Sequence, residues 1–495
     1  MRRANRRLLK WTCAVFLFGH GFTAFGQVSE LPGKNWQLKD LKSDHLFGIS
    51  MEKVYSEILK GKKAKPVIVA VLDGGVDIEH EDLKASIWTN NGEVPDNGMD
   101  DDGNGFIDDV HGWNFYNNMS QGDFEFDVHE LWIKLKQAKL FGRDTTNLHH
   151  LLNEKLKPER EKLQNVISER NALHTMLKRI GKEQLSIEDF KNFIPKDEQE
   201  LRVQKDMVYG LKKVPDFVSY ELNHLDRMVW QYDMELAYYL NQDYDMKTSG
   251  PASYHGTHIA GIIAAQRHND RGMDGVATLA KIMAVRVIPG IDLTGNRPEA
   301  KLELAGAGDG DDERMALAIR YAVDNGAKVI NMSFGPIHEL LKGKRLEAVN
   351  YALSKDVLIV HAAGNTSKDL DAVPVSVPAN WIEVGASGPN DDSSLAGSFS
   401  NYGAKTVDVF APGVDIYSTS PRSSYQTDTG TSMAAPVVSG LAAMLRAYYP
   451  ELKATQIKDI LIKTVVKREI LKDKCISGGV VNAYQAFGKS ESIGN

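Results

Sequence analysis

The stretch Gly430–Pro436 places a serine where nucleophilic chemistry is favoured. Ser432 follows two small residues and precedes a run in which apolar residues recur at spacings of three and four, which predicts a helix that starts at the serine. The unpaired N–H groups and the positive dipole end of a helix N-terminus stabilise a developing negative charge. Attack of a serine on a carbonyl creates such a charge. A serine that only caps the helix is the alternative, so the interpretation depends on partners elsewhere.

Three other polar residues stand in similar places. Asp73 follows a continuous β-branched run that is typical of a strand buried on both faces, and Asn365 follows a second buried strand. His255 precedes a predicted helix rich in small residues. Serine hydrolysis needs a nucleophile, a base, an acid that orients the base, and an oxyanion donor. Together with Ser432 these three residues supply all four types, although Asp73 alone would be read as a turn aspartate.

An alternation of strands and helices positions these residues. It predicts an α/β fold with a mostly parallel sheet and helices on both faces, in which chemistry collects at the carboxyl ends of the strands. The predicted strands are Pro66–Leu72, Ala280–Val287, Lys328–Phe334, Val357–Ala363, Trp381–Ala386 and Val407–Ala411, and the predicted helices include Glu313–Asn325, Leu346–Ser354, Ala454–Val465 and Val480–Phe487.

The N-terminus is typical of an exported protein. Residues 1–26 combine a basic start, an apolar run and a small-residue cleavage site, which indicates a signal peptide; a retained anchor is the alternative. Removal of this segment leaves Cys475 as the single cysteine, so we expect no internal disulfide. Residues 27–60 are interpreted as a short N-terminal extension. We expect a periplasmic, cell-surface or secreted location and no membrane span after signal removal.

Composition excludes one class of partner and leaves room for a large core. The chain has 495 residues, a formal charge of −7 and 42% hydrophobic residues. This negative charge does not fit nucleic-acid binding.

An acidic, turn-rich stretch lies at residues 91–112. Oxygen-bearing side chains alternate there and are followed by Gly105, as in the first half of a calcium loop. His111 stands where an EF-hand would have its bidentate glutamate, so a single calcium loop of another kind is expected, with a solvated acidic turn as the alternative. The predicted ligands are Asp100, Asp102, Asn104 and either Asp108 or Asp109.

Residues 119–250 are interpreted as a helical insertion. Lys, Glu, Leu, Gln and Met replace Gly and Val there, and an apolar stripe ends at Gly181. Ser186 is a predicted N-cap, and further helices are predicted at Glu198–Leu211 and Phe217–Leu240. The aromatic residues of the last helix are interpreted as core. The sequence of the insertion contains no recognisable catalytic or ligand-binding motif. Its role could be that of a lid, a docking surface or an inhibitory element.

Three motifs resemble those of the subtilisin-like serine proteases (subtilases). They are Asp73-Gly74-Gly75, the segment 255–261 (HGTHIAG) and the segment 430–436 (GTSMAAP), and the segment 362–365 (AAGN) matches the family's oxyanion asparagine. The order Asp, His, Ser is also that of the family. The resemblance covers residues 61–118 and 251–490, and residues 491–495 form a tail. Gly74 replaces the more usual Ser or Thr, a change we expect to be harmless.

The resemblance implies a serine endopeptidase that acts through an acyl-enzyme. Ser432 would attack the peptide carbonyl, His255 would take its proton and pass it to the leaving amine, and Asp73 would orient His255. The amide of Asn365 and the backbone N–H of Ser432 would bind the oxyanion. Protein or peptide substrates are implied, with a structural Ca²⁺ and no organic cofactor.

The resemblance also implies where the substrate binds. Ser333 and Gly335 would pair with extended substrate as an added strand. Ala362, Ala363 and Gly364 would form one wall of the first specificity pocket, and their small size favours apolar or aromatic side chains.

Other interpretations are weaker. A catalytically silent binding scaffold conflicts with the intact set of catalytic residues, and an α/β-hydrolase esterase conflicts with the absence of a Gly-x-Ser-x-Gly elbow around Ser432. His255 and His258 lack a third neighbour for a zinc site. Two features depart from the family: the short segment before the first strand, and the long insertion between Asp73 and His255.

Overall fold

The computed structural model describes residues 33–95, 97, 99–106, 108–115, 144–182, 185–212, 253–288 and 309–494, and part of 217–232. None of the helices in these ranges is both long and apolar enough to cross a membrane.

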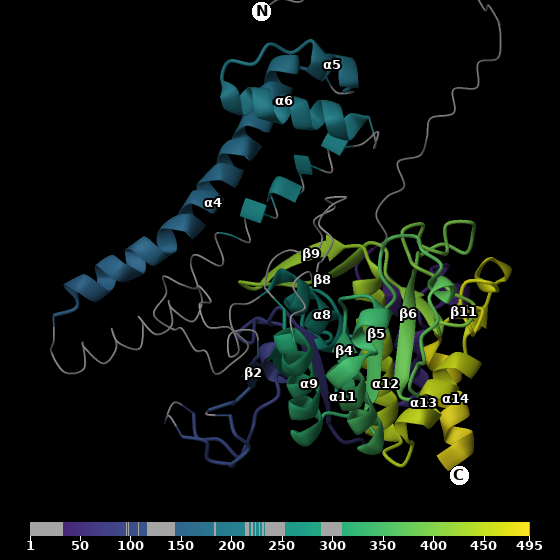
Figure 1. Ribbon diagram of the computed structural model, residues 1–495. Helices are drawn as coiled ribbons and strands as arrows, with labels where there is room; N and C mark the ends of the chain where they lie inside the picture. Colours follow the sequence, from purple (N-terminus) through teal and green to yellow (C-terminus); the bar gives the residue numbers. More distant parts are fainter. Residues whose placement is uncertain are drawn as a thin grey trace, which may run out of the picture. The chain divides into compact units, whose positions relative to one another are not determined.

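A nine-stranded sheet forms the centre of the described α/β region, and Figure 1 shows its strands beside the covering helices. The strand order is β10-β11-β7-β6-β5-β4-β1-β3-β2, and every neighbouring pair is parallel except β10 and β11. This confirms the predicted fold class. The strands are β1 (Val67–Asp73), β2 (Gly112–Asn114), β3 (Ala280–Arg286), β4 (Val329–Met332), β5 (Leu358–Ala362), β6 (Trp381–Ser387), β7 (Val409–Pro412), β10 (Val466–Lys467) and β11 (Gly479–Val480).

Both faces of the sheet are buried. Val69 and Val71 of β1 belong to one hydrophobic core, whereas Ala70 and Leu72 belong to another, because successive strand residues point to opposite faces. The first core includes α8 (Tyr254–Ala264), α12 (Thr431–Tyr448), α13 (Ala454–Lys463) and α14 (Ala483–Gly494); the second includes α9 (Asp309–Asp324) and α11 (Gly343–Ser354). This two-sided burial explains why β1 is continuously apolar in the sequence.

The segment 33–59, interpreted from the sequence as part of a short N-terminal extension, belongs to the main core of the α/β region. Trp36 is 1% exposed, and its indole N–H donates to the carbonyl of Asp415 at 3.1 Å. The side-chain amide of Asn482 donates to the hydroxyl of Ser50 at 2.9 Å. The apolar residues that segment 33–59 contributes to the main core are Trp36, Leu38, Ile49, Met51, Val54 and Leu59. The segment therefore contributes directly to the stability of the α/β region.

The insertion contains the helices α4 (Thr146–Ile180), α5 (Ile187–Lys191) and α6 (Glu198–Leu211). Gly181 ends α4 with φ of 66°, and Ser186 caps α5, as predicted. The three helices share a hydrophobic core that includes Leu173, Phe190 and Val203. The helix predicted at Phe217–Leu240 lies largely outside the described residues.

A hairpin that the sequence did not predict covers α8. It consists of β8 (Ile416–Ser420) and β9 (Ser424–Asp428), which pair antiparallel. A Cβ on Gly261 would lie 2.1 Å from the hydroxyl oxygen of Thr419, so only glycine permits this approach. The small residues of α8 thus let the helix pack closely against the hairpin.

Candidate active site

Asp73 and His255 come together although 182 positions separate them. Asp73 ends β1 and is 1% exposed, while His255 lies in the first turn of α8. The Nδ1 atom of His255 is 2.9 Å and 3.0 Å from the two carboxylate oxygens of Asp73. The backbone N–H of Gly74 also donates to Asp73, at 2.7 Å. The contact between His255 and Asp73 fixes the orientation of the imidazole ring, so that Nε2 is the nitrogen that would transfer a proton.

Gly256 makes this approach possible. A Cβ at this position would lie 2.2 Å from the carbonyl oxygen of Gly75 and 3.1 Å from Oδ1 of Asp73. The start of α8 therefore rests directly on the loop that follows β1. Any larger residue would separate His255 from Asp73.

Ser432 is the second residue of α12, which begins at Thr431. Its hydroxyl donates to the carbonyl of Ser333 at 3.0 Å, and the hydroxyl of Ser333 donates back to the carbonyl of Ser432 at 3.1 Å. Pro436 accounts for the second bond: it has no N–H, so the carbonyl four residues earlier is left without its usual helical donor. The proline of the serine motif thus frees a backbone acceptor that ties Ser432 to the segment that follows β4.

The orientation of the Asn365 amide follows from its neighbours. Its Oδ1 accepts the backbone N–H of Thr431 at 2.9 Å and the Thr431 hydroxyl at 2.8 Å. Because only the amide oxygen can accept these bonds, the Nδ2 donors face away from Thr431. Asn365 is exposed, so these donors are accessible to substrate.

Asn401 organises the loop that carries Asn365, a role the sequence did not indicate. Its Nδ2 donates to the carbonyl of Ala363 at 2.7 Å, and its Oδ1 accepts the backbone N–H groups of Thr366 and Lys368 at 3.1 Å and 2.8 Å. Three bonds from one buried side chain therefore bracket Asn365 on both sides. No local pattern marks this residue, because its partners lie more than thirty positions away.

The predicted substrate-binding residues follow two neighbouring strands. Ser333 and Gly335 follow β4, whereas Ala363 and Gly364 follow β5, and β4 and β5 are paired. Gly335 and Gly364 have φ of 73° and 99°, a region that favours glycine. The two segments flank the start of α12: Ser333 bonds to Ser432, and the N–H of Gly364 donates to the Thr431 hydroxyl.

His258 has a structural role. It is fully buried, and its Nε2 lies 3.2 Å from the carbonyl of Gln426. Burial disfavours the charged ring and lowers the pKa of His258 to about 4, despite the nearby carboxylate of Asp428. The ring is therefore neutral at pH 7.

Comparison with known proteins agrees with this geometry. Residues 64–488 match the family model described as "Subtilase family". The chain belongs to the subtilase family. Its α/β domain is that of a serine-type endopeptidase.

Curated relatives of this subtilase include three proteases. A cell wall-associated protease of Bacillus subtilis (strain 168) is 39% identical over 47% of this chain and 23% of its own length. Subtilisin DY of Bacillus licheniformis is 34% identical over 49% of this chain and 85% of its own length. Thermitase of Thermoactinomyces vulgaris is 39% identical over 47% of this chain and 74% of its own length. The matches thus span less than a quarter of the first relative and most of the other two.

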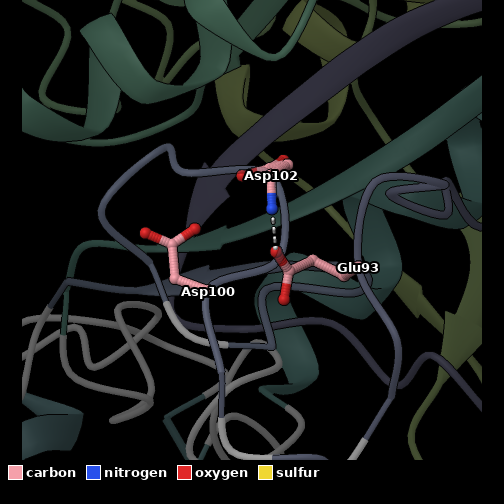
Figure 2. A group of neighbouring side chains, drawn as sticks. All are labelled: Glu93, Asp100 and Asp102. Carbon is pink, nitrogen blue, oxygen red and sulfur yellow. Dashed lines mark hydrogen bonds between the residues drawn. The ribbon is translucent and has the colours of Figure 1, made fainter.

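The acidic loop of this subtilase brings together carboxylates that include one the sequence did not indicate. Oxygens of Glu93, Asp100 and Asp102 lie within 4.8 Å of one another (Figure 2). Glu93 is 7% exposed; its Oε1 accepts the N–H groups of Asp101 and Asp102, while its Oε2 has no hydrogen-bond partner among the described residues. A buried carboxylate oxygen without a donor is costly unless a cation offsets it.

The other predicted metal ligands have different surroundings. Oδ1 of Asn104 accepts the N–H of Phe106, and Oδ1 of Asp108 accepts the N–H of Asn97. Asp109 is held by the hydroxyl of Tyr321 at 2.6 Å. Burial raises the pKa of Asp109 against the effect of that bond.

Proposed function

We propose that this chain is an exported serine endopeptidase that hydrolyses peptide bonds through Asp73, His255 and Ser432. The observation that carries the proposal is the 2.9 Å contact between His255 and buried Asp73. Ser432, in the first turn of α12, is the nucleophile that we assign to this pair. The signal-like residues 1–26 support export. The described helices of the insertion supply none of these groups, so we assign the insertion a lid or docking role rather than a chemical one.

Substrate binding would release the nucleophile. An extended peptide that pairs with the 333–335 segment would offer a backbone N–H to the carbonyl of Ser333, the acceptor now used by the Ser432 hydroxyl. The hydroxyl could then turn toward Nε2 of His255. The proton passes to His255 as the Ser432 oxygen bonds to the peptide carbon, and His255 later delivers it to the leaving amine. Water hydrolyses the resulting acyl-enzyme by the same route.

The oxyanion would be bound by Nδ2–H of Asn365 and the backbone N–H of Ser432. The bonds from Thr431 hold this amide in place before substrate arrives, so little reorganisation is needed during the reaction. Ala362, Ala363 and Gly364 would form one wall of the first pocket. They carry no charge, which favours apolar or aromatic side chains.

Labelling with a serine-reactive fluorophosphonate tests the proposal. The mature chain should be labelled in the presence of Ca²⁺, whereas Ser432→Ala should not. Ser439→Ala is the matched control, since Ser439 lies on the same helix but is buried and donates to Asn331. Labelling that is absent from the wild type, or that persists in Ser432→Ala, would remove this function.

We further propose that the acidic loop binds a structural Ca²⁺ through Glu93, Asp100 and Asp102, with Asn104 and Asp108 at the edge of the site. Carboxylate oxygens are ligands that this cation prefers. Because a bound ion stabilises only the folded state, EGTA should lower the thermal midpoint of the wild type. The effect should shrink in Glu93→Gln, which keeps an acceptor for the Asp101 and Asp102 amides. A midpoint that EGTA leaves unchanged would remove the metal assignment.

A further inference from the structure

Two charged side chains that the catalytic machinery does not use lie in the centre of the sheet. His361 on β5 and Glu383 on β6 are direct neighbours in the parallel register, and both are completely buried. The Nδ1 atom of His361 is 2.9 Å and 3.0 Å from the two oxygens of Glu383. The indole N–H of Trp381 also donates to Glu383, at 2.8 Å. Burying two charges is costly, so the pair calls for a physical reason.

The second ring nitrogen of His361 supplies that reason. Its Nε2 lies 3.0 Å from the carbonyl oxygen of Phe334. A carbonyl and a carboxylate both accept hydrogen bonds, so contacts on both sides of the ring require hydrogen on both nitrogens. Burial opposes this charged form, but the carboxylate of Glu383 and the carbonyl of Phe334 outweigh it and raise the pKa of His361.

Phe334 lies in the segment assigned to substrate binding. The ladder between β4 and β5 ends where Met332 faces His361, so Phe334 lies beyond the last paired residue. The side chain of His361 reaches past that end and holds the next part of the chain. On one side of Phe334, Ser333 is bonded to Ser432; on the other, Gly335 has φ of 73°.

A second ion pair continues the network. The backbone N–H of Glu383 donates to Asp408 at 2.9 Å, and Asp408 lies 3.0 Å from Nζ of Lys458 on α13. Lys458 also donates to the carbonyl of Trp381. Glu383, Asp408 and Lys458 are thus the charged groups around His361, and the four charges balance.

We propose that the His361–Glu383 pair is a positioning device that holds the Ser333–Gly335 segment in the form that binds extended substrate. This inference rests on the proposed function. The pair touches no substrate atom, and acts through the carbonyl of Phe334. It should therefore matter for long peptides, which pair with the segment, and little for a single-residue ester, which needs only the triad and the oxyanion donors.

Two variants that differ in a single hydrogen-bond donor test this. In Glu383→Gln the amide oxygen can still accept from Trp381, and its NH₂ can donate to Nδ1 of a neutral His361, whose Nε2–H remains on Phe334. The double variant His361→Phe/Glu383→Gln keeps a ring but has no donor for Phe334. Relative to Glu383→Gln, its KM for a four-residue peptide substrate should rise roughly ten-fold, with little change for the ester.

The pH profile gives a second readout. Above the pKa of His361 the wild-type ring keeps one hydrogen. The charged carboxylate of Glu383 is the stronger acceptor and holds that hydrogen on Nδ1, so the bond to the carbonyl of Phe334 is lost. The KM ratio of peptide to ester should therefore rise at alkaline pH in the wild type and stay flat in Glu383→Gln. His338→Gln, an exposed histidine on α10 (Ile337–Leu340), should behave as the wild type.

Several results would overturn the inference. If KM rises equally for peptide and ester in the double variant, the His361–Glu383 pair has a purely structural role. If KM for the peptide is unchanged, the pair has no role in substrate binding. If the double variant does not fold, the pH profile of the wild type decides: a KM ratio of peptide to ester that does not change with pH would contradict the positioning role of the pair. A wild type that hydrolyses neither substrate refutes the proposed function itself, and with it this inference.

Discussion

The oxygen and the nitrogen of the Asn365 side-chain amide have different partners. Its oxygen holds the start of α12 through Thr431, and its nitrogen is the donor that we propose for the oxyanion. In this proposal the residue has both a structural and a chemical role. Substitutions that remove one end at a time can separate the two contributions.

We expect Asn365→Asp and Asn365→Ala to lower kcat by about 10²–10³-fold, because each removes the oxyanion donor. Asn365→Asp keeps an acceptor for Thr431, whereas Asn365→Ala does not. The thermal midpoint should therefore fall more in Asn365→Ala. Steady-state kinetics and thermal unfolding measure the two effects, and a kcat near the wild-type value in either variant would contradict the donor role.

His258 makes stability depend on pH. The folded protein does not protonate this ring until about pH 4, whereas the unfolded chain takes up the proton near pH 6.5. The free energy of unfolding should therefore fall by roughly 3 kcal/mol as the pH drops across that window. Denaturant unfolding at several pH values measures this. His258→Asn should show a shallower dependence between pH 6.5 and 5, and an equal slope would argue against the assignment.

At the scale of elements, helix α8 carries His255, the proposed base, and contacts its neighbours through glycines that have no side chain. Gly256 touches the loop after β1, and Gly261 touches β8. The helix is thus fixed between the sheet and the β8–β9 hairpin. The distance from His255 to Asp73 depends on this packing more than on the two side chains.

Gly256→Ala should therefore impair both catalysis and stability. The added methyl would meet the carbonyl of Gly75, at a cost of roughly 1–3 kcal/mol, and would move His255 from Asp73. We expect a lower thermal midpoint and a lower kcat. Gly488→Ala on α14 is the matched control: the new methyl meets no atom within 4 Å, so stability should stay equal or rise. Wild-type kcat in Gly256→Ala would show that the contact is not needed.

At the scale of the whole molecule, the segment 33–59 completes the core that also contains α12. Each large buried apolar side chain contributes about 1.5–3 kcal/mol, and a protein of this kind is stable by only about 5–15 kcal/mol. The loss of six such residues would remove about 9–18 kcal/mol, which is comparable to the whole margin. We therefore expect the folded protein to need this segment.

A chain that begins at Gly61 should fail to fold, whereas one that begins at Gly33 should fold as the mature protein does. Solubility, thermal unfolding and fluorophosphonate labelling compare the two. An active, cooperatively folding chain from Gly61 would contradict this prediction.

The amino-acid sequence alone determined much of the fold and of the candidate site. A continuous β-branched run predicted β1, because a strand buried on both faces has no polar alternation. The alternation of strand-like and helical segments predicted the other five principal strands. Local motifs predicted Asp73, His255, Asn365 and Ser432, because each occupies a strand end or a helix start that the neighbouring residues define.

Only the tertiary structure decided which distant residues act together. Glu93 joins the acidic loop, Asn401 braces the Asn365 loop, and His361 reaches Glu383 and Phe334. Each of these contacts crosses between separate segments, so neither periodicity nor a local motif records it. A buried polar side chain has no water to bond with, so it must form hydrogen bonds within the fold. Which residue is its partner depends on how distant segments pack, and only the tertiary structure shows this.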